Sequence, residues 1–273
     1  MIYIDLDDAR VPALGFGTYR LEGRAARDGV AHALDLGYRH VDTAQVYGNE
    51  TEVGQGLRDA ETDRDAVFLT TKVWPDQFAH RKLIASTDES LRRLGTDYVD
   101  LLLLHWPNDD VELAETLDAL QEVQHQGKAR HIGVSNFTPS LLRRALEIAP
   151  GLACLQVEYH PLLDQSTLLE IVREHGLFLT AYTPIARNRV ADEDTIRAIA
   201  EAHGKSPAQV TLRWHLQQPR VAAIPKAASA AHREANLDVF DFELSDEEME
   251  RIHGLAREDG RMIDPNFAPE WGS

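Results

Sequence analysis

Short apolar runs alternate along the chain with longer segments in which apolar residues recur at helical spacing. The eight apolar runs read ALGFG, RHVDT, VFLTT, YVDLLLLH, ARHIGVS, CLQVEY, LFLTAY and VAAIP. The amphipathic segments cover residues 24–36, 50–59, 80–94, 111–126, 139–148, 166–175, 207–217 and 230–237. Runs that are apolar throughout, each separated by a helix, are typical of parallel strands that helices cover on the outside.

The ends of the predicted helices carry recognisable signals. Thr138 and Ser206 each precede a proline, so their hydroxyls can accept hydrogen bonds from free helix N–H groups while the proline occupies the first turn. Glycines fall where four of the helices should stop, at Gly37, Gly95, Gly127 and Gly176.

Eight strand–helix repeats in a chain of 273 residues favour a closed (β/α)₈ TIM barrel, an α/β fold, as one domain over residues 1–273. The alternative, a doubly wound sheet for a dinucleotide, usually has a glycine-rich turn after its first strand, and GFGTYR offers only Gly15 and Gly17. IYIDL predicts an N-terminal β-hairpin that turns near Asp7 and Asp8. The C-terminal IDPNFAPEWGS predicts a tail over the active-site rim, and the connection after Tyr182 is expected to be short.

Polar residues stand at or near the carboxyl ends of seven of the apolar runs. They are Asp42, Lys72, His105, Ser135, Asn136, Gln156, Tyr182 and Lys226. Each has a structural explanation by itself, and a histidine beside leucines is more often a packing residue than a catalyst. In a barrel, however, these ends form a single rim, which is where active sites are built. The fold hypothesis therefore predicts that all of them converge.

Asp42, Tyr47, Lys72 and His105 are expected to form one compact polar cluster. The carboxylate should keep the Lys72 ammonium charged, and the ammonium should lower the pKa of Tyr47 from about 10, which makes Tyr47 a proton donor near neutral pH. His105 could then orient a substrate carbonyl towards that phenol.

A general acid without a nucleophile suits a reaction in which another reagent attacks the carbonyl. The chain contains no HExxH, CxxC or GxSxG motif, and its twelve histidines show no metal-ligand spacing, so no metal site is expected. Protein side chains supply no hydride, whereas NADPH and NADH do.

Composition excludes several other classes of function. Asp and Glu total 45 against 28 Lys and Arg, and the net charge of −17 argues against nucleic-acid or anionic-membrane surfaces. The single cysteine, Cys154, permits no internal disulfide. The N-terminus lacks the pattern of a signal peptide, and no window reaches the roughly 18 apolar residues of a membrane span. We expect a cytoplasmic protein, and a monomer by default.

The chain resembles the aldo-keto reductase family over nearly its whole length. The segments that carry the resemblance are VPALGFGTYR, GYRHVDTAQVYGNETEVG, TKVWP, LLLLHWP and GKARHIGVSNF. The resemblance implies Tyr47 as proton donor, Lys72 and Asp42 as the pair that tunes it, and His105 as the group that orients the carbonyl.

The same resemblance implies a nicotinamide site. Ser135, Asn136 and Gln156 would hold the carboxamide, and Tyr182 would stack on the ring. The remaining residues expected at the cofactor are Thr183, Ile185, Lys226, His232 and Asn236.

IPKAASAAHREAN departs from the family pattern. Members that favour NADPH usually carry Ser or Thr directly after the lysine and Arg six residues after it, and these places hold Ala227 and His232. Alanine cannot bind a 2′-phosphate and histidine binds it weakly, so we predict that NADPH binds, through Lys226 and His232, with a reduced preference over NADH.

The substrate would be a small-molecule carbonyl compound. Tyr19, Trp74, Trp106 and Phe137 would surround it. The chain looks most like bacterial members such as 2,5-diketo-D-gluconate reductases, so small aldehydes, α-keto compounds and keto-sugars are expected. Two alternatives are a regulatory module that binds the cofactor without turnover, and a lyase or isomerase that uses Lys72 as a Schiff-base amine.

Overall fold

The computed structural model describes residues 1–271 and confirms the predicted (β/α)₈ barrel. Parallel strands form one sheet in the order β10-β9-β8-β7-β6-β5-β4-β3, which is the order of the chain. The strands are β3 (Phe16–Gly17), β4 (His40–Asp42), β5 (Phe68–Val73), β6 (Val99–Leu104), β7 (Ala129–Ser135), β8 (Cys154–Glu158), β9 (Phe178–Tyr182) and β10 (Val221–Ala223). Each lies on one of the predicted apolar runs, because the barrel core and the helices bury the strands on both faces.

The first and last strands of the sheet close the ring. Parallel bridges join Leu14 to Ala223 and Gly17 to Lys226. The amide of Gly15 donates to the carbonyl of Ala223 at 2.8 Å. A Cβ at Gly17 would lie 2.7 Å from the carbonyl oxygen of Ile224, so only glycine permits this close approach.

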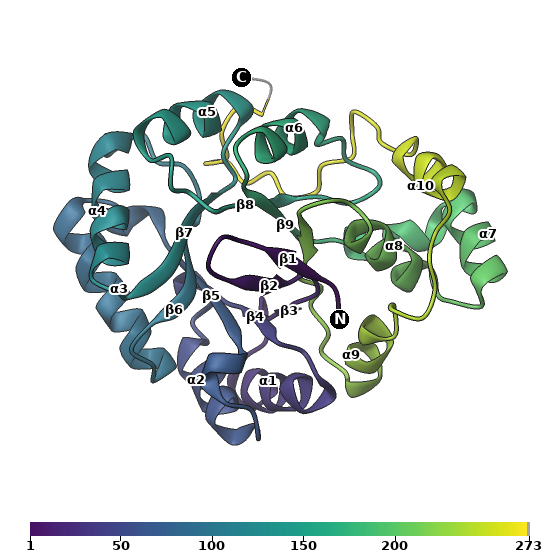
Figure 1. The fold of residues 1–273 in the computed structure, drawn as a ribbon, viewed down its shortest axis with the longest axis horizontal. Coiled ribbons are helices and arrows are strands. Elements are labelled where there is room, and N and C mark those ends of the chain that lie inside the picture. Colours follow the sequence, from purple (N-terminus) through teal and green to yellow (C-terminus); the bar gives the residue numbers. More distant parts are fainter. Residues whose placement is uncertain (272–273) are drawn as a thin grey trace.

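Helices surround the strands (Figure 1). They are α1 (Gly23–Leu36), α2 (Glu50–Asp59), α3 (His80–Leu94), α4 (Leu113–His125), α5 (Pro139–Ile148), α6 (Ser166–Glu174), α7 (Asp194–His203), α8 (Pro207–Leu216), α9 (Ala230–Leu237) and α10 (Asp246–His253). Short 3₁₀ segments are η1 (Gln45–Tyr47), η2 (Arg64–Ala66), η3 (Pro75–Gln77) and η4 (Ala186–Asp192). All eight predicted helices are present, and the predicted caps form, since Thr138 accepts from the amide of Leu141 and Ser206 from that of Gln209.

The prediction of a short connection after Tyr182 is wrong. That connection contains η4 and the whole of α7 before α8 begins. The segment begins with polar residues and arginines, which do not indicate a buried helix. The apolar stripe of α7 is short and consists of Ile196, Ile199 and Ala200, all of which are buried. Helix α10 was also missed, although Ser245 and Glu248 form a capping box that the sequence displays.

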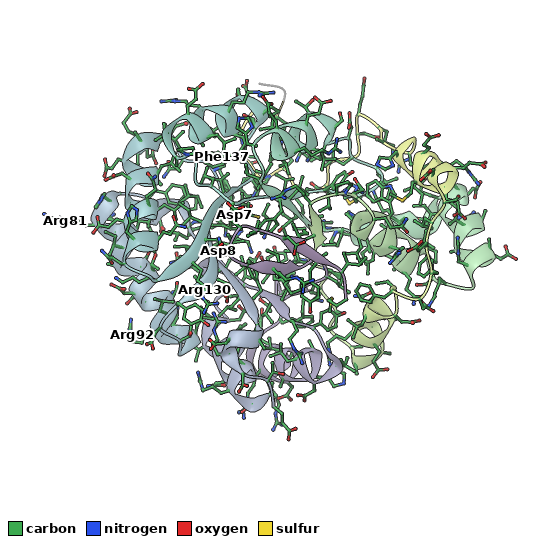
Figure 2. All side chains as sticks on the ribbon, viewed as in Figure 1. Asp7, Asp8, Arg81, Arg92, Arg130 and Phe137 are labelled. Carbon is green, nitrogen blue, oxygen red and sulfur yellow. The ribbon has the colours of Figure 1, made fainter. Side chains whose placement is uncertain are left out.

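The predicted N-terminal hairpin crosses the middle of the ring (Figure 1). Strands β1 (Tyr3–Asp5) and β2 (Arg10–Pro12) pair antiparallel, and Asp7 and Asp8 lie at the turn between them (Figure 2). Ile4 and Val11 are buried, and Asp8 lies 3.7 Å from His131 near the start of β7. The hairpin therefore covers the amino ends of the strands and leaves the opposite mouth for a site. Within residues 1–271, no helix is long and apolar enough to cross a membrane.

Candidate active site

A cavity of about 820 Å³ opens where the strands end in their carboxyl direction. Its volume lies in the range that is typical of small-ligand sites, about 300–1,000 Å³. Its lining is Gly17, Tyr19, Arg20, Asp42, Val46, Tyr47, Trp74, His105, Trp106, Asn136, Gln156, Tyr182, Thr183, Pro184, Ile185, Arg187, Ile224, Pro225, Lys226, Met262, Ile263, Asp264, Pro265 and Phe267. Most of the polar residues predicted at the rim therefore do meet.

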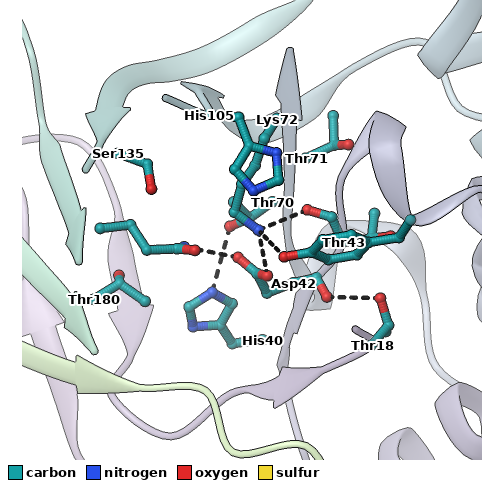
Figure 3. Close-up of polar contacts among 12 residues, drawn as sticks. Thr18, His40, Asp42, Thr43, Thr70, Thr71, Lys72, His105, Ser135 and Thr180 are labelled. Atoms are coloured by element: carbon teal, nitrogen blue, oxygen red, sulfur yellow. Dashed lines mark hydrogen bonds and ion pairs between the residues drawn. The ribbon is translucent and has the colours of Figure 1, made fainter. Parts of the chain in front are cut away.

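Asp42 and Lys72 form a buried ion pair at the ends of the neighbouring strands β4 and β5. The Lys72 Nζ atom lies 2.6 Å from Asp42 Oδ1 and donates to the carbonyl of Thr43 at 2.9 Å (Figure 3). Gln156 donates to the other carboxylate oxygen of Asp42 at 2.8 Å. Burial lowers the pKa of Lys72, and the charge of Asp42 opposes this shift. Both charged groups are thus fixed in place, with the ammonium next to Tyr47.

Tyr47, at the end of η1, lies above this pair. Its hydroxyl oxygen is 3.4 Å from Lys72 Nζ, and its ring packs 5.0 Å from that of Tyr19. Burial, followed by the charge of Asp42, raises the pKa of Tyr47 well above 10. The predicted lowering of this pKa is therefore wrong, because the Lys72 charge is already matched by Asp42 and a buried phenolate would face that carboxylate. Tyr47 rests as a neutral phenol.

His105 follows β6 directly, and its ring lies against both Tyr47 and Trp74, with ring centroids 5.7 and 5.2 Å apart. Its Nδ1 atom is buried without a hydrogen-bond partner among residues 1–271. Burial and the nearby charge of Lys72 lower the pKa of His105 well below 6.5, so the imidazole is neutral. A neutral imidazole carries one N–H, which can donate to a carbonyl oxygen.

Asn136, Gln156 and Tyr182 place two amides and a phenol ring beside this cluster. The Tyr182 hydroxyl donates to Asn136 Oδ1 at 2.7 Å, and Asn136 Nδ2 donates to the carbonyl of His105 at 2.9 Å. Ser135 is buried behind them, 3.1 Å from Asn136 Nδ2, and does not line the cavity. Its hydroxyl accepts a hydrogen bond from Asn136, and its contact with a carboxamide stays a prediction.

Some of the remaining residues predicted at the cofactor line the cavity, and others lie outside it. Thr183, Ile185 and Lys226 line the cavity, whereas His232 and Asn236 on α9 do not. His232 is exposed near the start of α9, where its amide donates to Ser229 at 3.2 Å. Any contact of His232 with a ligand must thus lie outside the cavity, beyond Lys226.

Arg233 is the arginine beside the altered family position, and its side chain turns inward. Its Nη1 atom donates to the carbonyls of Ala227 and Ala228 at 3.1 and 3.0 Å, and its Nε atom to His32 at 3.2 Å. The side chain is buried. This guanidinium therefore stabilises the loop before α9. It does not take the place of the family arginine, whose position is held by His232.

Three of the four residues predicted around the substrate, Tyr19, Trp74 and Trp106, line the cavity, and the fourth does not. The side chain of Phe137 is buried beside α5 (Figure 2) and lines a separate cavity of about 210 Å³ with Phe78. The prediction that Phe137 lies around the substrate is therefore wrong. It follows Asn136, whose φ of 63° turns the chain after β7 and directs the next side chain away from the mouth.

The C-terminal tail supplies wall residues that sequence reasoning did not name. The expected position of the tail over the rim is confirmed by residues 262–265 and Phe267, which line the cavity. The Phe267 ring lies 5.7 Å from that of Trp74 and 5.4 Å from that of Trp106. The aromatic residues Phe267 and Trp271 were the signal that the sequence of the tail offered. Across residues 1–271, no group of His, Cys, Asp and Glu could hold a metal ion.

Known proteins share this sequence and fold. A model described as the aldo/keto reductase family matches residues 13–257. Methylglyoxal reductase DkgB of Yersinia pestis is 40% identical over 266 residues, which cover 96% of this chain and 99% of the relative. The 9,11-endoperoxide prostaglandin H2 reductase of Trypanosoma cruzi is 39% identical over 272 residues, or 96% of this chain and 94% of the relative.

Solved structures agree. A candidate 2,5-diketo-D-gluconic acid reductase B superposes with a TM-score of 0.97 at 48% identity and covers 99% of this chain and 97% of its own. The aldo-keto reductase of Bombyx mori, solved in complex with NADP, gives 0.89 at 30% identity and covers 98% of both chains. Sequence, fold and the residues at the barrel mouth lead to one conclusion: the chain belongs to the aldo/keto reductase family.

Proposed function

We propose that this protein is an NAD(P)H-dependent reductase of small carbonyl compounds, with aldehydes, α-keto compounds and keto-sugars as its range. The main supporting observation is that Tyr47 and His105, whose Nδ1 atom has no hydrogen-bond partner, line one cavity, while the buried Lys72 ammonium lies 3.4 Å from the Tyr47 hydroxyl. An acid, a charge that can stabilise its conjugate base, and a donor for the carbonyl oxygen are the groups that carbonyl reduction requires from the protein.

The residues beside this cluster fit a nicotinamide. Asn136 and Gln156 offer amide groups to a carboxamide, and Tyr182 offers a ring face, its hydroxyl held by Asn136. When bound, the reduced cofactor supplies the hydride. The role of Asn136, Gln156 and Tyr182 is to fix the face that is presented to the substrate.

Three cations suit the cofactor phosphates. Arg20, Arg187 and Lys226 line the cavity and follow β3, β9 and β10, which are neighbours around the closed ring. None of the three makes an ion pair within residues 1–271, in a chain of net charge −17. Loops after the last two barrel strands are the usual phosphate site of this fold. We therefore assign the dinucleotide phosphates to this side.

The chemistry assigned to the side chains follows from their protonation. His105, neutral at rest, donates its N–H to the carbonyl oxygen and holds it near Tyr47. Tyr47, a neutral phenol at rest, gives its proton to that oxygen as the alkoxide charge develops. The resulting phenolate oxygen lies 3.4 Å from the Lys72 ammonium, which stabilises it until a proton returns.

The direct test is to mix the protein with NADPH and methylglyoxal and follow the absorbance of the reduced nicotinamide. Steady oxidation of the cofactor, with the alcohol recovered in equal amount, is the expected result. Saturable NADPH binding without turnover across a panel of aldehydes would instead identify a module that only binds the cofactor.

A further inference from the structure

We propose that the substrate end of the cavity selects neutral aromatic or apolar carbonyl compounds and rejects those that carry a carboxylate, with Asp264 and Phe267 as the specificity-determining residues. This inference rests on the proposed function and narrows its substrate range. It concerns the sector over β5 and β6, opposite the cations assigned to the phosphates.

The mouth of the cavity is unusually apolar for a surface. Five large hydrophobic side chains are exposed within residues 1–271, and three of them, Tyr19, Val46 and Phe267, at 49%, 48% and 54%, line this cavity. Exposed apolar side chains that gather around one cavity indicate a ligand that covers them. A polyhydroxylated sugar would find few hydrogen-bond partners on these three side chains.

The wall is aromatic and its rings hold one another. Phe267 meets Trp74 and Trp106 edge-to-face, with interplanar angles of 83° and 87°. Trp106 also packs against Trp271, 6.0 Å away. Rings held in this way form an aromatic wall on which a flat substrate ring can pack with favourable edge and face contacts.

Two carboxylates line the cavity, and one of them, Asp42, is paired with Lys72. Asp264 lines the cavity, and its Oδ1 atom accepts from the Trp271 indole at 2.9 Å, which fixes its orientation. Arg261, a cation of the same tail, stacks 3.6 Å from the Trp271 ring, lies 4.0 Å from Glu158, and does not line the cavity. A substrate carboxylate that enters this part of the cavity therefore meets a charge of the same sign.

The cations that line the cavity lie elsewhere on the rim, and Lys72, the buried cation on β5, is paired with Asp42. Arg20, Arg187 and Lys226 follow β3, β9 and β10, whereas Trp74 and Trp106 follow β5 and β6. With the cofactor phosphates on the first sector, the substrate sector retains the Asp264 charge.

The test compares 4-formylbenzoate with its methyl ester, methyl 4-formylbenzoate. They differ in charge, and because the ester withdraws electrons more strongly than the ionised carboxylate, intrinsic reactivity also favours the ester; the salt dependence of the gap therefore reports the effect of charge. We expect kcat/KM for the ester to exceed that for the acid by about tenfold or more at low salt, and the gap to shrink as ionic strength rises. Equal values, or a preference for the acid, would overturn the proposal.

Asp264→Asn removes the charge and keeps an oxygen for the Trp271 indole. It should raise kcat/KM for the acid about fivefold and leave the ester within twofold. The matched control is Asp259→Asn, the same change at an exposed carboxylate of the same tail that lies outside the cavity. If Asp264→Asn and Asp259→Asn change the acid-to-ester ratio equally, the effect belongs to overall charge and the assignment of Asp264 is wrong.

Phe267→Ala tests the aromatic arm separately. It should lower kcat/KM for the ester about tenfold while methylglyoxal, which has no ring to pack on the aromatic wall, changes less than twofold. An equal loss for both substrates would show that Phe267 is not a specificity residue. Turnover of the aldehyde panel by the unmodified protein separates the two proposals. Its absence would contradict the reductase itself, whereas its presence with an undiminished rate for the acid would contradict only this inference.

Discussion

The buried carboxylate of Glu158 accepts a hydrogen bond from the main-chain N–H of Met262, 104 residues later in the chain, at 2.9 Å. The next amide, that of Ile263, donates to the same carboxylate at 2.9 Å. Glu158 ends β8, whereas Met262 and Ile263 belong to the tail that lines the cavity. One barrel strand thus sets the position of the tail.

Glu158→Gln should therefore loosen the tail without touching the cofactor residues. The loss of the charge weakens the hydrogen bonds from both amides and the 3.0 Å contact with His160, and we expect KM for methyl 4-formylbenzoate to rise about fivefold. The dissociation constant for NADPH should stay within twofold. Glu170→Gln, on the exposed face of α6, is the matched control. Unchanged KM values together with unchanged protease sensitivity of the tail would contradict the role assigned to Glu158.

Tyr47→Phe should remove most turnover and leave cofactor binding intact. The substitution deletes the proposed proton donor and keeps the ring that packs on Tyr19, so kcat should fall about a thousandfold. Fluorescence titration with NADPH measures the binding. Tyr98→Phe, which removes a hydroxyl bonded to Asp65 on the surface, serves as the control and should retain full activity. A Tyr47→Phe enzyme with more than a tenth of the original kcat would exclude Tyr47 as the acid.

The pH dependence follows from the two shifted groups. Burial lowers the pKa of His105 well below 6.5 and raises that of Tyr47 well above 10, so both stay neutral through the neutral range. Protonation of His105 would remove activity only well below pH 6.5, and ionisation of Tyr47 only well above pH 10. We expect kcat/KM to be nearly flat from about pH 6 to 9. An acid limb centred near pH 6.5 that disappears in His105→Asn would contradict this.

The preference for NADPH over NADH should be weaker than in family members that carry Ser or Thr directly after the lysine and Arg six residues after it. Ala227 is buried, His232 is exposed, and Arg233 is bound to main-chain carbonyls. We expect measurable turnover with NADH, and His232→Arg should raise the NADPH-to-NADH ratio of kcat/KM about tenfold. His125→Arg on α4 makes the same change away from the site and should not move the ratio. An unmodified enzyme that already prefers NADPH by several orders of magnitude would show the prediction to be wrong.

Lys72 should not form a Schiff base. Its ammonium is held by Asp42 at 2.6 Å and by the carbonyl of Thr43 at 2.9 Å, which keeps a proton on the nitrogen although burial lowers the pKa. Treatment with methylglyoxal and borohydride, followed by mass spectrometry of the Lys72 peptide, should therefore reveal no reduced adduct. A stoichiometric adduct at Lys72 would favour the lyase or isomerase alternative.

The sequence was sufficient for the barrel and for the meeting of Asp42, Lys72 and His105, because strand order alone brings the ends of parallel strands to one rim. It was insufficient wherever the answer depended on distances. The pKa of Tyr47 moves opposite to expectation since Asp42 matches the Lys72 charge. Phe137 follows Asn136, whose left-handed backbone conformation no sequence pattern indicates, so the direction of the Phe137 side chain was not predictable. The contacts between Glu158 and the tail join residues too far apart for any periodicity to reveal.

The bridge between Gly17 and Lys226 has a consequence for how the protein reaches its working form. This bridge is part of the seam, the contact between the first and last barrel strands. During synthesis the barrel therefore stays open until nearly the whole polypeptide has left the ribosome. The proposed phosphate anchors Arg20 and Lys226 flank this seam on its two sides. A dinucleotide that contacts both residues would hold the first and last strands together. The cofactor should therefore protect the amides of residues 13–17 from hydrogen exchange more than those of any strand on the opposite side of the barrel.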